Sequence, residues 1–166
     1  MTSIDLAASC ATSAPEIVLG AGALVMILVG VWRGDAAFRG LSFAAILLFL
    51  LAGWLLVDGG PARTLAWNGL YVADGLAAFL KILILVGAAA SLAMAVPALE
   101  RLGVARFEYP LLVMLSTLGM FVMVSANNLL SLYLGLELMS LASYVLAAFH
   151  RDDARSSEAG LKYFVL

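Results

Sequence analysis

The sequence has few charged residues and a single cysteine, and each shortage excludes a class of protein. Charged residues make up 12% of the 166 positions, whereas hydrophobic residues make up 64%. A soluble globular domain carries about 25% charged residues, so this composition excludes one. Because Cys10 is the only cysteine, no disulfide can form within the chain.

Metal, redox and nucleic-acid chemistry also lack the residues that they need. His150 is the only histidine, so the chain has no ligand set for a transition-metal cluster. No glycine-rich phosphate loop follows a strand. The net charge is −2 and no basic cluster is present, which gives no reason to expect a nucleic-acid partner. We therefore expect no cofactor and no redox centre in this chain.

Long apolar runs dominate the sequence. They cover residues 15–32, 41–57, 74–96, 110–126 and 128–149, and a sixth begins near residue 157. About 20 apolar residues of helix cross a bilayer, whereas a transmembrane barrel would show strands of alternating polarity. The pattern predicts an all-α, polytopic transmembrane helix bundle, with about five full spans and the start of a sixth in a single transmembrane domain over residues 1–166.

Prolines and serines indicate where several helices begin and end. Pro15 and Pro110 suit the first turn of a helix, where the missing N–H has no helical partner. Pro97 suits a stop just past a helix. Ser156 or Ser157 is expected to cap the sixth helix.

The two ends of the sequence lead to two further expectations. Small residues near Cys10 resemble a secretory signal, but Asp5 and Glu16 are acidic and the small residues precede the apolar run. A signal shows the opposite order, so we expect a short exposed tail before the first span. The sequence stops at Leu166 inside an apolar run, so we expect a fragment of a longer chain.

The segment from residue 58 to residue 73 is predicted to form turns or a small hairpin on the membrane face. It contains five residues that favour turns, namely Gly59, Gly60, Pro61, Asn68 and Gly69. Three aromatic residues in and beside this segment suit the membrane interface, namely Trp54, Trp67 and Tyr71.

Basic residues outside the predicted spans are concentrated on one side. Only Arg63 lies on the other side. The six arginines in the loops after the first, third and fifth helices are Arg33, Arg39, Arg101, Arg106, Arg151 and Arg155. By the positive-inside rule these loops are cytoplasmic, and the N-terminus is periplasmic.

Glu137 is the charged residue whose position calls most for a function. It lies within the otherwise uncharged run 128–149, roughly 13 Å from Asn128 along a helix axis. A charge near the bilayer centre costs at least about 2.5 to 3.5 kcal/mol. On the same helix face, Tyr133, Ser140 and Tyr144 supply hydroxyls that relay a proton or hold water. We predict that Glu137 is a switchable carboxylate.

Two lysines also lie within predicted spans. Lys162 follows Glu158 by one helical turn, so it forms a local ion pair, snorkels to the interface or turns inward to Glu137. Lys81 lies seven residues after Asp74. It pairs with Asp74, snorkels outward or contacts a neighbouring subunit, and these alternatives are favoured over a direct role in proton transfer.

Two polar pairs have simple interpretations. Asn127 and Asn128 are expected to form a tight turn between two spans, because Asn tolerates turn conformations. Asp152 and Asp153 are expected to be solvated loop residues.

The C-terminal quarter carries a family resemblance. It reads SANNLLSLYLGLELMSLASYVLAAFHRDDARSSEAGLKYFVL from residue 125 to the end, and it resembles the antiporter-like membrane subunits of proton-pumping NADH:quinone oxidoreductase, respiratory complex I. The element NLLSLYLGLELMSLASY is similar to the family's fifth-helix motif with a key glutamate, here Glu137. EAGLKYFVL resembles the subunit N group, with its sixth-helix lysine at Lys162. YVADGLAAFLKILIL is similar in layout only.

The resemblance implies a longer subunit built of inverted helical repeats, of which this chain is the N-terminal part. It implies proton translocation coupled to electron transfer from NADH to quinone, with Glu137 coupled to an inward-facing Lys162. FMN, iron–sulfur clusters and quinone are then held by other subunits. The implied partners are other membrane subunits of complex I, including neighbouring antiporter-like subunits, and the lipid bilayer of the bacterial inner (plasma) membrane.

Two other functions stay open on the sequence. One is a subunit of a cation/proton secondary antiporter, which exchanges sodium without an NADH-oxidising partner. The other is a structural membrane module in which Glu137 and Lys162 only hold helices together.

Overall fold

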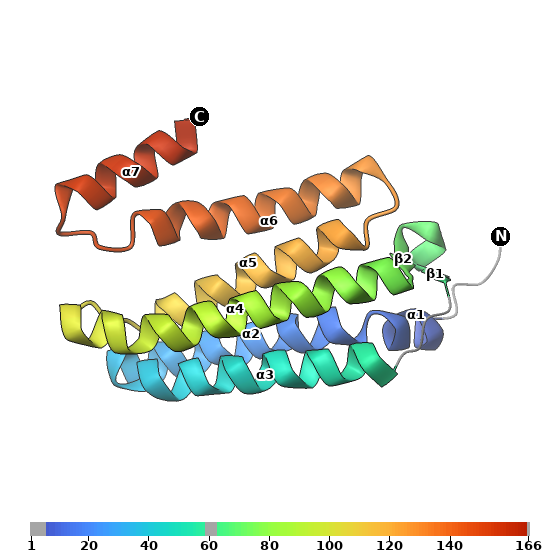
Figure 1. The fold of residues 1–166 in the computed structure, drawn as a ribbon, viewed down its shortest axis with the longest axis horizontal. Coiled ribbons are helices and arrows are strands. Elements are labelled where there is room, and N and C mark those ends of the chain that lie inside the picture. Colours follow the sequence, from blue (N-terminus) through green and yellow to red (C-terminus); the bar gives the residue numbers. More distant parts are fainter. Residues whose placement is uncertain (1–5, 59–62, 166) are drawn as a thin grey trace.

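All long elements of the computed structural model are helices (Figure 1), and the model describes residues 6–58 and 63–165. The helices are α1 (Leu6–Thr12), α2 (Ala14–Arg33), α3 (Phe38–Asp58), α4 (Gly75–Leu102), α5 (Glu108–Val124), α6 (Leu129–Ala147) and α7 (Ala154–Val165). Two strands, β1 (Thr64–Ala66) and β2 (Tyr71–Ala73), form a hairpin. Two 3₁₀ segments, η1 (Gly34–Ala37) and η2 (Trp67–Gly69), complete the described elements.

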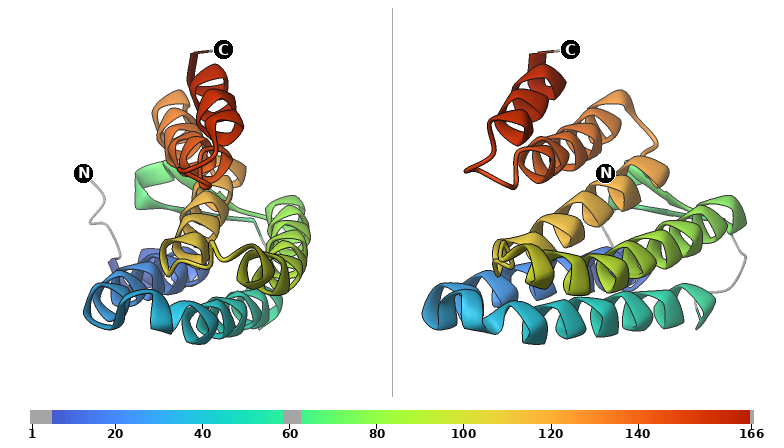
Figure 2. Two further views of the ribbon diagram at one scale, coloured as in Figure 1. Left: turned by 90° about the vertical axis from the view of Figure 1, so that its left-hand side faces the viewer. Right: turned by 60° about the vertical axis from the view of Figure 1, so that its left-hand side comes forward.

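Helices α2 to α6 run side by side along the long axis of the molecule, so their connections gather at two ends (Figure 1). The hairpin end holds α1, β1 and β2. The other end, here the arginine end, holds the six loop arginines, since it contains the α2–α3, α4–α5 and α6–α7 connections. Figure 2 shows α2 to α5 as one group, with α6 on α5 and α7 on α6.

The helices are long and apolar enough for a membrane protein. Three stretches of the described chain meet the length and composition of a span, Ala14–Asp58, Gly75–Leu102 and Leu129–Ala147. The first consists of α2 and α3 joined by η1, and the shorter apolar helix α5 packs among them. The predicted membrane helix bundle is confirmed at this level.

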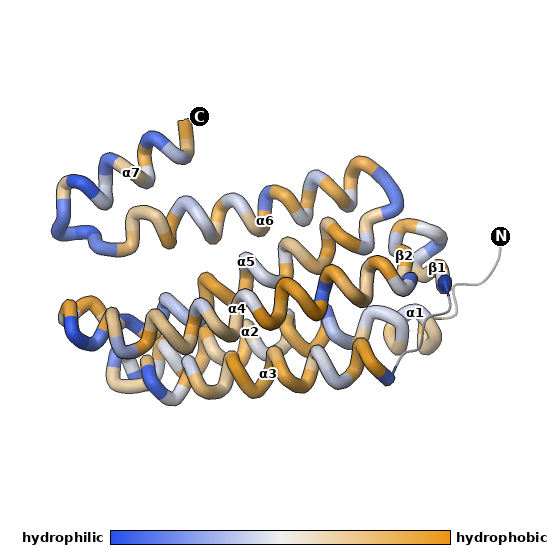
Figure 3. Tube along the Cα trace, in the orientation of Figure 1, coloured by the Kyte–Doolittle hydropathy of each residue, from blue (hydrophilic) through white to orange (hydrophobic). Residues whose placement is uncertain are grey.

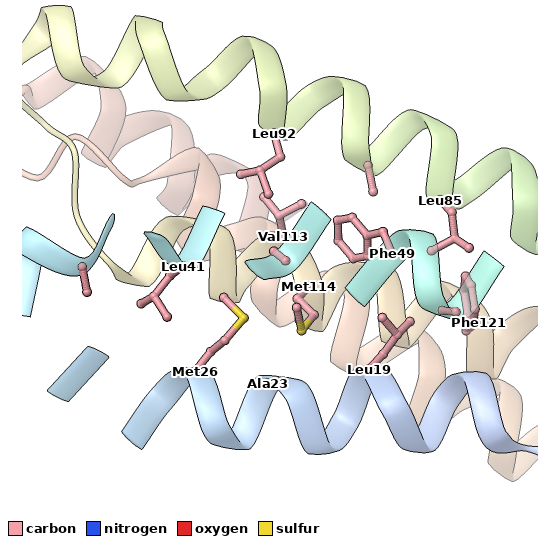
Figure 4. Packing of buried hydrophobic residues seen from close by; sticks show 14 residues of the cluster. Leu19, Ala23, Met26, Leu41, Phe49, Leu85, Leu92, Val113, Met114 and Phe121 are labelled. Carbon is pink, nitrogen blue, oxygen red and sulfur yellow. The ribbon is translucent and has the colours of Figure 1, made fainter. Parts of the chain in front are cut away.

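The buried core lies between α2, α3, α4 and α5 (Figure 4). Its largest fully buried apolar side chains are Phe49, Phe121, Leu19, Leu92 and Met114. Large apolar residues are also common on the outside, for example Trp32, Leu47 and Val86, and hydrophobic residues occur along the whole length of α2 to α5 (Figure 3). A soluble protein would hide such a surface, whereas lipid or further membrane helices cover it without cost.

Two glycines bring α5 and α6 into very close contact. A Cβ added to Gly119 would lie 2.5 Å from the Met139 backbone nitrogen, and one added to Gly135 would lie 2.8 Å from the Met123 backbone nitrogen. Small residues at such crossings let two membrane helices approach through their backbones. The glycine pair therefore holds α6, the helix of Glu137, against α5.

The predicted hairpin is confirmed for the part of it that the structure describes. Strands β1 and β2 pair with Leu65 opposite Val72, and the Asn68–Gly69 turn uses left-handed backbone at φ 56° and 81°, which Asn and Gly tolerate. The turn predicted at Gly59, Gly60 and Pro61 lies outside the described residues.

The hairpin is also bonded to the α5–α6 connection. The Val72 N–H donates to the Ser125 carbonyl at 2.9 Å, and the Asn127 side-chain amide donates to the Gly69 carbonyl at 2.7 Å. Asn128 caps α6, with its side chain accepting from the Ser131 N–H at 2.7 Å. The asparagines thus form the predicted turn and also fix the start of α6.

Two predicted helix boundaries were wrong. Pro97 lies inside α4, because only one backbone hydrogen bond is lost there and the helix continues to a left-handed Gly103 cap. The sixth predicted helix, α7, begins at Ala154, before Ser156 and Ser157. Asp153 lies in the α6–α7 connection, where its carboxylate also accepts from the Arg155 N–H at 2.9 Å.

The N-terminal tail also differs from the prediction. Residues Leu6–Thr12 form α1 instead of an exposed tail. Ser9 and Ser13 are buried, and their hydroxyls accept from the backbone and the ring N–H of Trp67. These bonds hold α1 against the hairpin.

The close α5–α6 contact predicts that Gly119→Ala destabilises the chain. The added methyl group meets backbone, which cannot move aside as a side chain can, so we expect a loss of about 1–3 kcal/mol. Thermal unfolding in detergent measures this loss. Gly87→Ala in α4 is the control, because nothing lies within 4 Å of its added Cβ. Equal stability of the two variants would contradict the role of the crossing.

Candidate functional site

Glu137 lies near the middle of α6, at the ninth residue of the helix. Its side chain is half-buried. The helix places it there because the Asn128 cap sets the first turn and no residue of α6 interrupts the helical pattern. The predicted mid-helix carboxylate is therefore present, about 13 Å from the capped end.

The predicted stripe of hydroxyls on α6 is divided between two environments. Tyr133, one turn before Glu137, lies on the same face of α6 and is largely exposed. Tyr144 packs edge-on against Tyr163 and Phe164 of α7, with ring centres 4.9 and 5.5 Å apart. The start of the stripe is thus open, and its other end forms the contact with α7.

Lys162 lies on α7 and forms an ion pair with Glu158 at 2.6 Å. Both side chains are largely exposed, at 69% and 64%. The local pair that the spacing allowed is thus present in the structure. The predicted coupling between Lys162 and Glu137 is not formed among the described residues, and their joint role stays a prediction.

A cluster that the sequence did not reveal lies at the hairpin end. The Lys81 ammonium, 2% exposed, donates to Glu16 Oε1 at 2.5 Å and to the Tyr71 hydroxyl at 2.8 Å. The Tyr71 hydroxyl in turn donates to Glu16 Oε1 at 3.0 Å. The ammonium also lies 5.5 Å from the centre of the Phe121 ring on α5. These four residues are called the Lys81 cluster below.

The Lys81 cluster changes two predictions. Lys81 pairs with Glu16 of α2 and not with Asp74, whose carboxylate caps α4 by accepting from the Ala77 N–H at 2.7 Å. Because it is buried, Lys81 does not snorkel outward. Tyr71 turns inward instead of serving an interfacial belt, and burial, reinforced by the Glu16 charge, raises the pKa of its hydroxyl above the ordinary value.

The sequence held a weak signal for this pairing. Glu16 lies in the first turn of α2, and Lys81 lies in the second turn of α4. Both helices begin at the hairpin end, so opposite charges enter the bundle at similar depth from the same side. The pattern does not show that α2 and α4 are neighbours, and the partner was therefore missed.

Metal binding has no support in the described residues. Across residues 6–58 and 63–165, no group of three or more His, Cys, Asp or Glu side chains could hold a metal ion. The polar groups brought together are an acid, an amine and phenols, which suit proton transfer.

Comparisons with known proteins find similar membrane subunits. Residues 126–166, which include Glu137 and Lys162, match a family model described as NADH:quinone oxidoreductase/Mrp antiporter, TM. Curated relatives named NADH-quinone oxidoreductase subunit N match 92% of the chain, at 52% identity in Parvibaculum lavamentivorans and 51% in Paramagnetospirillum magneticum. The chain spans about a third of the length of these relatives, 32% and 31%.

A solved structure has the same arrangement of helices. Respiratory complex I from Thermus thermophilus with bound Aureothin contains a chain that is 28% identical, with a TM-score of 0.73 over 91% of this chain and 32% of that one. The resemblance to subunit N found in the sequence is thus confirmed.

The Lys81 cluster predicts an asymmetry between single and double substitutions. Lys81→Met strands the Glu16 carboxylate in the interior, so we expect a loss of about 3–5 kcal/mol. Glu16→Gln combined with Lys81→Met removes both charges, and we expect most of that loss to be recovered. Chemical or thermal unfolding in detergent measures both.

The matched control is the exposed pair of Arg151 and Glu108, with N–O 2.9 Å and side chains 61% and 36% exposed. Arg151→Met should cost less than about 1 kcal/mol. An equal cost for the Arg151 and Lys81 single variants would contradict the burial argument.

Proposed function

We propose that this chain forms part of the proton-translocating membrane subunit N of a bacterial NADH-quinone oxidoreductase. The observation that carries the proposal is the similarity to subunit N over 92% of the chain, which includes the helix of Glu137. The mid-helix carboxylate and the apolar bundle support it. We further propose about five full spans, with the hairpin end facing the periplasm and the arginine end facing the cytoplasm.

In the proposed mechanism Glu137 takes up and releases a proton within the membrane. The Tyr133 hydroxyl, one helical turn before it on the same face of α6, provides a local donor and acceptor for that proton. Lys162 provides the positive charge that favours the ionised carboxylate when the two approach. Flavin, iron–sulfur clusters and quinone belong to other subunits in this proposal, and this chain contributes only the proton path.

The proposed mechanism requires the Lys162 side chain to exchange one carboxylate partner for another. In the structure the Lys162 ammonium is paired with Glu158, which lies one helical turn earlier on α7. Coupling of Lys162 to Glu137 therefore requires this exposed pair to separate. An i,i+4 pair contributes only about 0.2–0.5 kcal/mol, which is a small cost for a switch.

A cation/proton antiporter stays the alternative, because the matched family model covers both kinds of protein. The relatives matched over most of the chain favour complex I.

Glu137→Gln in the full-length subunit tests the proposal directly. The amide keeps the shape and removes the exchangeable charge, so NADH-driven proton pumping should fall several-fold while the complex still assembles. Fluorescence quenching of a pH-sensitive dye in membrane vesicles measures pumping. Asp152→Asn, which neutralises an exposed carboxylate in the α6–α7 connection, is the control and should pump normally. Normal pumping by Glu137→Gln would refute the role, and sodium-driven exchange without NADH would favour the antiporter.

Replacement of Lys162 separates its two possible partners. Lys162→Met should lower pumping several-fold, whereas Lys162→Arg should retain more of it because the positive charge remains. The same vesicle assay applies. If Lys162 serves only Glu158, then Lys162→Met and Glu158→Gln will both pump normally, and Lys162 has no part in translocation.

A further inference from the structure

Lys81 is one of the residues that line a cavity at the hairpin end. The cavity has a volume of about 280 Å³. Its polar lining consists of Thr12, Thr64, Tyr71, Asp74 and Lys81. One water molecule needs only about 10–15 Å³ of such volume together with two to four polar partners. The site is therefore large and polar enough to hold several waters.

Two hydrogen-bonding positions of the Lys81 cluster have no partner among the described residues. An ammonium has three N–H donors, and within the described part of the chain Lys81 uses two of them, toward Glu16 and Tyr71. Glu16 Oε2 is buried, and no described residue hydrogen-bonds to it. A buried acceptor without a partner costs about 1–3 kcal/mol, so bound water or a proton would stabilise the cluster.

We propose that Lys81, Glu16 and Tyr71 form a second proton-exchange site, in which the Lys81 ammonium gives a proton to water in the cavity and later takes one back. The inference rests on the proposed function, since it adds a proton-carrying group to the same subunit. In the forward step one N–H bond of Lys81 breaks and one O–H bond forms on water. The amine is then neutral, and the proton leaves through the cavity. The reverse step restores the ion pair.

The groups around Lys81 allow both charge states. The Glu16 carboxylate of α2, the Asp74 carboxylate at the start of α4 and the Phe121 ring face of α5 favour the ammonium. Desolvation opposes it. The Tyr71 hydroxyl of β2 accepts from the ammonium and can donate to the neutral amine. This balance distinguishes the cluster from a partly exposed pair such as Arg151 with Glu108.

The cavity gives the site an aqueous face of its own. Its walls come from α1, α2, α3, β1, β2 and α4, all at the hairpin end. Lys81 lies about 10 Å along α4 from the Asp74 cap, at 1.5 Å per residue. Protons would therefore exchange with the side that we propose to be periplasmic.

Charge-conserving and charge-neutral variants separate proton exchange from a structural lock. In the full-length subunit within the complex, Lys81→Arg keeps the positive charge but does not release a proton. The double variant Glu16→Gln with Lys81→Met removes both charges and keeps the interior neutral. Both should assemble, oxidise NADH and show several-fold lower pumping per NADH. If either variant assembles and pumps normally, the cluster is only a structural lock and the inference is overturned.

Thiol labelling tests the water-filled cavity even where those variants do not assemble. Cys10→Ser first removes the native thiol. Ala78 lies in the cavity wall and Leu83 lies on the exposed face of α4 outside the cavity, so Ala78→Cys and Leu83→Cys each add one thiol at a defined place. A small charged methanethiosulfonate added on the hairpin side should label Ala78→Cys several-fold faster than Leu83→Cys. Equal, slow labelling of the two would show a dry cavity and overturn the inference.

Glu137→Gln, measured in parallel, distinguishes the two proposals. Normal pumping in Glu137→Gln would count against the proposed function of the subunit. Normal pumping in the Lys81 variants, with defective pumping in Glu137→Gln, would remove only the second site.

Discussion

Every charge placed inside an apolar bundle needs a partner, and this constraint organises the molecule. An unpaired ion in a low-dielectric interior costs several kcal/mol, and lipid offers no hydrogen bonds to replace those of water. Lys81 meets the constraint within the chain, through Glu16 and Tyr71. Glu137 meets it only in part, because its side chain is half-buried and forms no ion pair within the described residues.

The difference between these two sites follows the packing of the helices. Helices α2 to α5 enclose a common core, and Lys81 lies at the hairpin end of that group. Helix α6 packs mainly on α5, and α7 packs on α6. Glu137 therefore lies at the edge of the described bundle, whereas Lys81 lies inside it. A longer subunit, of which this chain matches about a third, would provide further helices for that edge.

The apolar spans and the mid-helix glutamate could be predicted because they depend on local composition. Run length predicted the helices, and the turn residues Asn68 and Gly69 predicted the hairpin. Pro97 misled the prediction, since a single lost hydrogen bond does not end a long helix that continues to a left-handed Gly103 cap. Glu16 was missed because its partner lies 65 residues away, and such a pairing depends on which helices become neighbours.

Helix α5 lies between the two charged sites and touches both of their surroundings. Its Phe121 ring faces the Lys81 ammonium, and its Gly119 lies against the α6 backbone at Gly135 and Met139, each two residues from Glu137. The hairpin also contacts both regions. Its strand β2 carries Tyr71 of the Lys81 cluster and is hydrogen-bonded to the connection that leads from α5 into α6. A shift of α5 or of the hairpin would thus alter the environment of both charges together. Rigid packing at Gly119 and Gly135 transmits such a shift to α6, because backbone contacts leave no flexible side chain to absorb it.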